Sequence, residues 1–168
     1  MTVNSERLLL IFRLGKRMVA LPLDAVHRIV PMADLARPPA LPEVLEGILN
    51  WAGTAVPVVR LARLLRLPHS ELSLYSMLVL MKSSDGSDKP VALLVDSVRE
   101  ILKVTNDELI TVSERDSFNA CIDATASVRE QVIYLLSPER ILLARERESL
   151  DAYRSIEQLR VNDWRPEA

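Results

Sequence analysis

The stretch Val19-Ala-Leu-Pro-Leu-Asp-Ala-Val-His-Arg-Ile29 decides how this sequence folds, because a second stretch of the chain matches it without gaps. The second stretch, Val91-Ala-Leu-Leu-Val-Asp-Ser-Val-Arg-Glu-Ile101, lies 91 − 19 = 72 residues further along and shares Val, Ala, Leu, Asp, Val and Ile at the same spacing. In each copy an apolar run leads through an aspartate into a segment with Val and Ile, a pattern typical of a strand, a corner and another strand. The repeat predicts two related β-rich halves.

Short apolar runs outside the repeat predict further strands. Runs on either side of Gly15-Lys16 predict a hairpin, and Ala52-Gly53 predicts a second hairpin between 48–51 and 54–59. The remaining strands are expected around 26–30, 77–81, 91–95, 98–104, 122–128 and 132–136, with a polar loop at 83–89. The chain is therefore expected to be mainly β.

Prolines and glycines punctuate the region between the two hairpins. Three prolines make 37–42 an extended connector, since proline lacks the amide donor and fixes φ. Residues 42–46 are expected to form one helical turn that ends at Gly47 in the left-handed conformation. Leucines at helical spacing then predict a short helix that ends near Pro68.

The end of the chain is expected to be helical, over about 138–161. Ser137 can cap a helix, and proline suits the first helical position that follows it. Apolar side chains then recur at every third position, and this stripe is expected to pack on the β-rich body. A partner-binding or self-associating helix is the alternative. The stripe consists of Leu150, Tyr153, Ile156 and Leu159.

Bulk composition limits the class of protein. The chain has 168 residues, of which 49% are hydrophobic and 26% charged, so it can build a core. A formal net charge of −2 gives no electrostatic reason to expect nucleic acid or an anionic membrane as the main partner. Cys121 is the single cysteine, which points to a reducing compartment. We expect a cytoplasmic protein that does not insert into a membrane.

Side chains for catalysis or cofactor binding are sparse. The two histidines, His27 and His69, have no second ligand at a metal-binding spacing, and Cys121 is expected to be a packing residue. The four glycines do not form a phosphate-binding loop. The sequence thus predicts no enzyme activity, no cofactor and no metal site.

Several motifs, taken in order, resemble the CheW-like domain family. The resemblance runs from about Leu8 to Leu143. Its pieces are Phe12-Arg-Leu-Gly15, Val19-Ala-Leu-Pro22, Val26-x-x-Ile29, Leu41-Pro42, Gly47-Ile-Leu-Asn50, Gly53, Val56-Pro-Val58 and Val91-Ala-Leu-Leu-Val-Asp-Ser-Val98.

The resemblance implies both a fold and a role. The fold is mainly β, with two five-stranded β-barrel-like (SH3-like) subdomains, short helices and a C-terminal α-helix. A single domain is expected over 7–161, with halves at roughly 7–70 and 74–143. The implied role is a non-enzymatic adaptor that couples chemoreceptors to a CheA-type histidine kinase. It would dock on the CheW-like domain of the kinase and on the helical tip of the receptor.

The resemblance also implies partner-binding positions. Val26, Arg28, Ile29, Gly47 and Gly53 fall where the family contacts kinase or receptor. Core packing is the alternative for the two aliphatic residues, and local turn geometry is the alternative for the two glycines. Because alternate residues of a strand face opposite sides, Val26 and Arg28 are expected to share a face that excludes Ile29.

Two departures from the family pattern enlarge this set. Where the family has Asn-Leu-Arg-Gly, this chain reads Asn50-Trp51-Ala52-Gly53, and Arg60 replaces an acidic residue. These changes reverse the local charge pattern and suggest either a changed partner or a member outside the standard chemotaxis set. Trp51 could be an interface residue, since tryptophan is enriched among binding hot spots, or a core plug.

Other functions stay open from the sequence. A CheW-like coupling protein of a non-motility pathway is the nearest alternative. A small β-barrel enzyme or ligand-binding protein with a pocket between the halves is a different class. A nucleic-acid-binding barrel is disfavoured by the net charge.

Overall fold

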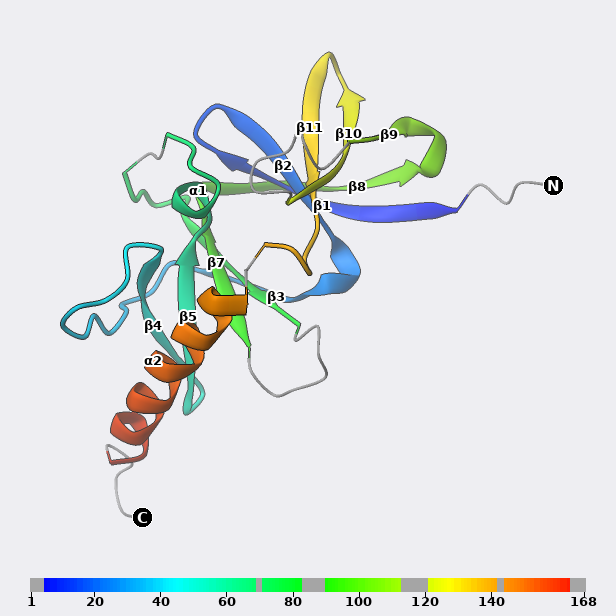
Figure 1. Ribbon diagram of the computed structural model, residues 1–168. Helices are drawn as coiled ribbons and strands as arrows, with labels where there is room; N and C mark the ends of the chain where they lie inside the picture. Colours follow the sequence, from blue (N-terminus) through cyan, green and yellow to red (C-terminus); the bar gives the residue numbers. More distant parts are fainter. Residues whose placement is uncertain (1–4, 69–70, 83–89, 113–120, 142–143, 164–168) are drawn as a thin grey trace.

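The structure is a computed structural model that describes residues 5–68, 71–82, 90–112, 121–141 and 144–163 (Figure 1). His69 and the polar loop expected at 83–89 lie outside these residues. The strands of the described part are β1 Glu6–Leu14, β2 Arg17–Pro22, β3 Val26–Pro31, β4 Leu45–Trp51, β5 Thr54–Arg60, β6 Met77–Met81, β7 Val91–Val95, β8 Ser97–Thr105, β9 Leu109–Thr111, β10 Ile122–Val128 and β11 Gln131–Leu136. The helices are α1 Leu61–Leu64 and α2 Ala144–Asp163, with 3-10 turns η1 Leu23–Ala25 and η2 Asn106–Glu108.

The described strands form two sheets, which confirms the mainly β prediction. The first sheet has the order β8-β1-β2-β11-β10-β9, and the second has the order β3-β6-β7-β5-β4. The second sheet has the five strands expected, whereas the first has six. The additional strand, β9, has three residues, too few to show the alternation that predicts a strand.

The pairing register places the two copies of the repeat at equivalent points of different sheets. Ala20 of β2 pairs with Ile11 and Leu135. Ala92, 72 residues later in β7, pairs with Leu80 and Val58. In both sheets the strand that follows the corner is an edge strand. In the second sheet this is β3, which lies beside β6, and in the first sheet it is β8, which lies beside β1. Each copy of the repeat therefore crosses from one sheet to the other, and the sheets are not the consecutive halves 7–70 and 74–143. The boundaries of those halves stay predictions.

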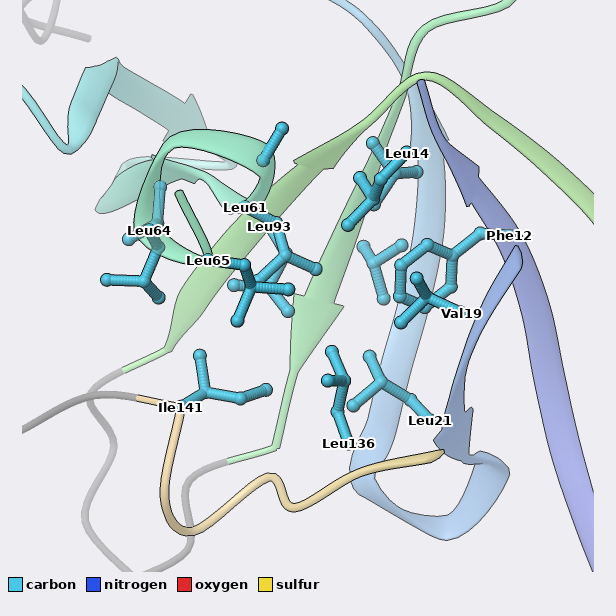
Figure 2. Close-up of a cluster of buried hydrophobic side chains, with 14 of the residues drawn as sticks. Phe12, Leu14, Val19, Leu21, Leu61, Leu64, Leu65, Leu93, Leu136 and Ile141 are labelled. Atoms are coloured by element: carbon cyan, nitrogen blue, oxygen red, sulfur yellow. The ribbon is translucent and has the colours of Figure 1, made fainter. Parts of the chain in front are cut away.

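Buried side chains form three clusters. One contains residues of β1, β2, β8, β10 and β11, and a second contains residues of β4, β5, β6 and β7, so each sheet curls around its own cluster. The third lies where the two sheets meet (Figure 2). We call it the shared core. It includes Phe12, Leu14, Val19, Leu21, Leu61, Leu93, Leu136 and Ile141.

Strand β1 shows why its sequence is apolar without alternation. Leu9 and Ile11 face the cluster of the first sheet, while Leu10 and Phe12 face the shared core. All four side chains are nearly inaccessible to solvent. A strand buried on both faces reads as a continuous hydrophobic run. Each such side chain stabilises the fold by roughly 1.5–3 kcal/mol relative to an exposed position.

Two predicted helical segments differ in the structure. Residues 42–45 form a single hydrogen-bonded turn, in which the Leu45 amide donates to the Pro42 carbonyl (2.9 Å), but no helical turn reaches Gly47, because β4 begins at Leu45. The C-terminal helix begins at Ala144 within the described residues rather than at about 138. Ser137 instead donates its amide to the Cys121 carbonyl (2.7 Å) and accepts from the Arg140 amide (3.2 Å). This turn places Ile141 in the shared core before the helix starts.

Helix α2 lies along β4 and β5 (Figure 1). The predicted stripe packs only in part: Leu150 is buried and Tyr153 packs on the shared core, but Ile156 and Leu159 are 49% and 67% exposed. The reason is the period of the helix. Three residues turn an α-helix by only about 300°, so a strict three-residue repeat drifts by roughly 60° at each step. Glu157, which is buried, replaces Ile156 on the packed face.

Two isoleucines of the first sheet provide a test of this core. Ile11 is 1% exposed and Ile101 is 55% exposed, although they lie on adjacent strands. We expect Ile11→Ala to lower the free energy of unfolding by about 2–5 kcal/mol, because it leaves a cavity. Ile101→Ala should lower it by less than about 1 kcal/mol. Urea unfolding measures both, and equal losses would contradict the assigned faces of β1 and β8.

Candidate partner-binding site

The hairpin between β4 and β5 carries four of the candidate residues. Ala52 (φ 49°) and Gly53 (φ 87°) occupy its two-residue turn, and positive φ at both positions is what a type I′ turn requires. The side-chain oxygen of Asn50 accepts a hydrogen bond from the Gly53 amide (3.0 Å). The predicted hairpin is confirmed. Gly53 serves the turn, Asn50 fixes it, and Ala52 is exposed at its tip.

Arg28 and Trp51 meet across the second sheet. The guanidinium carbon of Arg28 lies 5.6 Å from the centroid of the Trp51 ring, within the range of a cation–π contact. β3 and β4 are the two outer strands of this sheet, so the contact joins its edges. The half-buried indole also packs on the cluster of the second sheet. Trp51 is thus part of the core and part of the surface, which the sequence presented as alternatives.

A bulge in β3 overturns the expected division of its residues. Val26 pairs with Met81 and Arg28 pairs with Leu80, so one extra residue stands between them. Val26 is buried in the shared core and Ile29 packs against the same core, whereas Arg28 is exposed. Strict alternation fails because a bulge shifts the side-chain phase by one residue. The expectation that Val26 and Arg28 share a face was wrong.

Gly47 lies inside β4 and not at a helix end, and the glycines with positive φ in the described part of the chain are Gly15 and Gly53. Its role is close approach. A Cβ at Gly47 would stand 2.7 Å from the Leu35 Cβ and 2.8 Å from the Ala36 carbonyl oxygen. Ala36 forms an isolated bridge with Ile48, with hydrogen bonds of 2.9 Å in both directions. Glycine allows the segment Leu35–Ala36, just before the proline-rich connector, to lie against the strand.

Arg60 faces the interior rather than a partner. It is 8% exposed, and its Nη1 lies 3.5 Å from the Oε2 of Glu46, whose side chain is 10% exposed. Arg37 and Arg63 also contact this carboxylate, at 3.5 and 3.8 Å. We call these four residues the Glu46 cluster. Because Arg60 is buried and paired with Glu46, its guanidinium is not presented on the surface of the hairpin.

Helix α2 holds the hairpin through one side chain. The amide group of Gln158 accepts from the Ala55 N–H (2.8 Å) and donates to the Gly53 carbonyl (2.9 Å). Strand β5 pairs with β7 only over Val58–Arg60. The Gln158 side chain hydrogen-bonds to Ala55, in the part of β5 that precedes this pairing. Nothing in the sequence marks Gln158 for this position, because its partners lie about 100 residues away.

The structure therefore separates the candidates into two groups. Arg28, Asn50 and Ala52 are exposed, and Trp51 and Gly53 are partly exposed beside them. Val26, Gly47 and Arg60 are buried, and Ile29 is half-buried against the shared core. The sequence did not single out the remaining contacts of this region. These are Arg37, Glu46, Arg63 and Gln158.

The residues considered for catalysis do not gather. His27 is exposed in β3, whereas Cys121 is buried and its thiol donates to the Arg140 carbonyl (3.2 Å). Among the described residues no group of three His, Cys, Asp or Glu side chains is placed to hold a metal. A cavity of about 230 Å³ is lined by residues of the first sheet and its β1–β2 turn, away from the β4–β5 hairpin. In the described part, no helix has the length and apolar character needed to cross a membrane.

Gly47→Ala tests the close approach. The new methyl group must displace the Leu35 Cβ and the Ala36 carbonyl oxygen, so we expect a loss of about 1–3 kcal/mol in the free energy of unfolding. Ala52→Gly is the control of opposite sign. It relieves a positive φ, so stability should stay unchanged or rise by up to about 1 kcal/mol. Thermal and urea unfolding measure both, and full stability of Gly47→Ala would show that the contact is misplaced.

The Glu46 cluster makes a second prediction. Glu46→Gln removes the carboxylate that lies 3.5 Å from the buried guanidinium of Arg60, which should cost about 3 kcal/mol of stability. Arg37→Gln is the matched control, because the side chain of Arg37 is 55% exposed and an exposed pair contributes at most about 1 kcal/mol. Urea midpoints at equal m-values provide the comparison. Similar small losses for both variants would count against an internal role of Arg60.

Comparisons with known proteins agree with this architecture. A family model described as the CheW-like domain matches residues 8–146. A chemotaxis protein CheW of Thermotoga maritima is 25% identical over 131 residues, covering 78% of this chain and 84% of that protein. A chemotaxis protein CheW of Treponema pallidum is 24% identical over 115 residues, covering 65% of each.

A solved structure shares the fold. The crystal structure of the scaffolding protein TtCheW from Thermoanaerobacter tengcongensis matches with a TM-score of 0.75 and 18% sequence identity. The match covers 86% of this chain and 93% of that one. The family model spans both sheets and the shared core between them. The chain belongs to the CheW-like domain family.

Proposed function

We propose that this protein is a non-enzymatic scaffold that couples chemoreceptors to a CheA-type histidine kinase in the cytoplasm. The observation that carries the proposal is the family match over residues 8–146. This range includes both sheets and the two copies of the repeat, each of which passes from one sheet to the other. A coupling protein needs two surfaces held in a fixed relation. A shared core that locks two β subdomains together supplies that rigidity.

The exposed end of the second sheet is the surface that we assign to a partner. Arg28, Asn50, Trp51 and Ala52 gather there from β3 and from the β4–β5 hairpin. Tryptophan and arginine are the residue types most enriched among binding hot spots. Val26, Gly47 and Arg60 act indirectly in this proposal. They hold the strands that present the exposed residues.

A coupling protein of a non-motility pathway with altered partner specificity is the second candidate. The departure at Ala52 favours it, because this position is exposed at the tip of the hairpin. The departure at Arg60 gives it less support, since Arg60 is paired with Glu46 inside the molecule. The two candidates differ in the identity of the receptor and kinase and not in the way the protein works.

Assembly with purified partners tests the function. The full chain is mixed with chemoreceptor tip fragments and with the CheW-like domain of the histidine kinase encoded by the same genome. We expect a ternary complex in size-exclusion chromatography, and binding to each partner alone in calorimetry. Ala52→Glu should weaken at least one of the two interactions about tenfold, because it places a large charged group at the hairpin tip.

The matched control is Ala52→Gly, which keeps the turn and adds no side chain. It should bind as the wild-type protein does. Absence of binding to both partners at micromolar concentrations would reject the scaffold function. Binding with no effect of Ala52→Glu would instead move the contact surface away from the hairpin.

A further inference from the structure

The internal repeat allows each residue of the candidate surface to be compared with its equivalent in the other sheet. Arg28 pairs with Leu80 in the second sheet, and Glu100 pairs with Ile11 in the first. Leu80 and Ile11 pair in turn with Ala92 and Ala20, the two repeat alanines. Arg28 and Glu100 therefore occupy the same place in the two sheets.

The two hairpin turns are equivalent in the same way. Trp51 and Thr54 flank the turn of β4–β5, and Val128 and Gln131 flank the turn of β10–β11. Both turns have two central residues with positive φ. In the first turn these are Ala52 and Gly53, and in the second they are Arg129 (φ 50°) and Glu130 (φ 67°). Ala52 and Arg129 therefore correspond.

The chemistry of these equivalent pairs is opposite. In the first sheet, Nη1 of Arg129 lies 3.4 Å from Oε1 of Glu100, so the acid and the base satisfy each other. In the second sheet the acid is replaced by Arg28 and the base by Ala52. Within the described residues, the side chain of Arg28 has a ring contact with Trp51 and neither an ion pair nor a hydrogen bond. No carboxylate of the described residues pairs with this guanidinium.

Stacking on the Trp51 indole orients the Arg28 guanidinium so that it can bind a carboxylate. The ring contact restricts the long side chain, while the N–H groups in the guanidinium plane stay available. Such a group can donate two parallel hydrogen bonds to one carboxylate. The short side chain of Ala52 leaves open the space that Arg129 fills at the other hairpin. A carboxylate from outside can approach where the first sheet supplies its own partner.

We propose that Arg28, stacked on Trp51, binds an aspartate or glutamate side chain on the helical tip of a chemoreceptor. This inference rests on the proposed function and names the chemistry of one contact. The partner supplies the acid that Glu100 supplies within the first sheet. A helix suits the site because the platform is one arginine and one indole, which accommodates a single side chain from a narrow segment.

Binding of the receptor tip fragment to Arg28→Gln tests the contact. Removing the charge should weaken binding about tenfold or more, because charge-assisted hydrogen bonds are lost. Arg129→Gln is the matched control at the equivalent pair of the first sheet, and it should bind like wild type. High salt should reduce the difference between wild type and Arg28→Gln.

Charge exchange separates recognition from a structural effect. Acidic residues of the receptor tip are replaced one at a time by lysine, and each fragment is titrated against wild type and Arg28→Glu. One lysine variant should lose affinity for wild type and regain it with Arg28→Glu. A structural role of Arg28 predicts no such rescue. The double variant Arg28→Glu with Ala52→Arg should rebuild the internal pair of the first sheet, stay folded and not bind the native tip.

The outcomes distinguish this inference from the function on which it rests. If wild type binds neither receptor nor kinase, the scaffold function fails together with the inference. If wild type binds the receptor tip and Arg28→Gln binds it equally well, the inference is wrong and the scaffold function stands. Loss of kinase binding alone in Arg28→Gln would also overturn the assignment to the receptor.

Discussion

The shared core between the two sheets is the interaction on which the rest of this structure depends. Phe12, Val19 and Leu21 of the first sheet meet Val59 and Leu93 of the second there. Strands β1 and β5 are buried on both faces, so removal of either sheet would expose a continuous apolar surface to water. The two β subdomains are therefore packed against each other through one buried cluster, to which both sheets contribute.

Buried contacts beneath the candidate surface hold its exposed residues in place. Gly47 lets the segment Leu35–Ala36 lie against β4, and the Glu46 cluster anchors the end of β5. Gln158 of α2 bonds to the hairpin turn itself. Trp51 connects these buried contacts to the exposed surface. Its ring packs on the buried cluster of the second sheet and also makes the cation–π contact with Arg28. A preorganised surface of this kind loses little conformational entropy when a partner binds.

The repeat shows how one architecture supports two surface chemistries. Equivalent positions keep Ala, Val and Leu where packing demands them, as at Ala20 and Ala92. They differ where side chains reach solvent, as at Glu100 and Arg28. Solvent-accessible positions of an edge strand tolerate such exchange because few neighbours constrain them. The internal ion pair of the first sheet and the stacked arginine of the second are alternative solutions at one geometric site.

The sequence by itself determined the β-rich class, both hairpins, most strands and the 72-residue repeat, because alternation, turn residues and apolar runs are local signals. It also placed Arg28, Trp51 and Ala52 among the candidates. Only the tertiary structure decided which candidates reach solvent. The bulge in β3, the close approach at Gly47 and the pairing of Arg60 with Glu46 arise between segments that are not neighbours in the chain. The contact of helix α2 with the hairpin through Gln158 also depends on tertiary packing, because its partners Gly53 and Ala55 lie about 100 residues away in the chain.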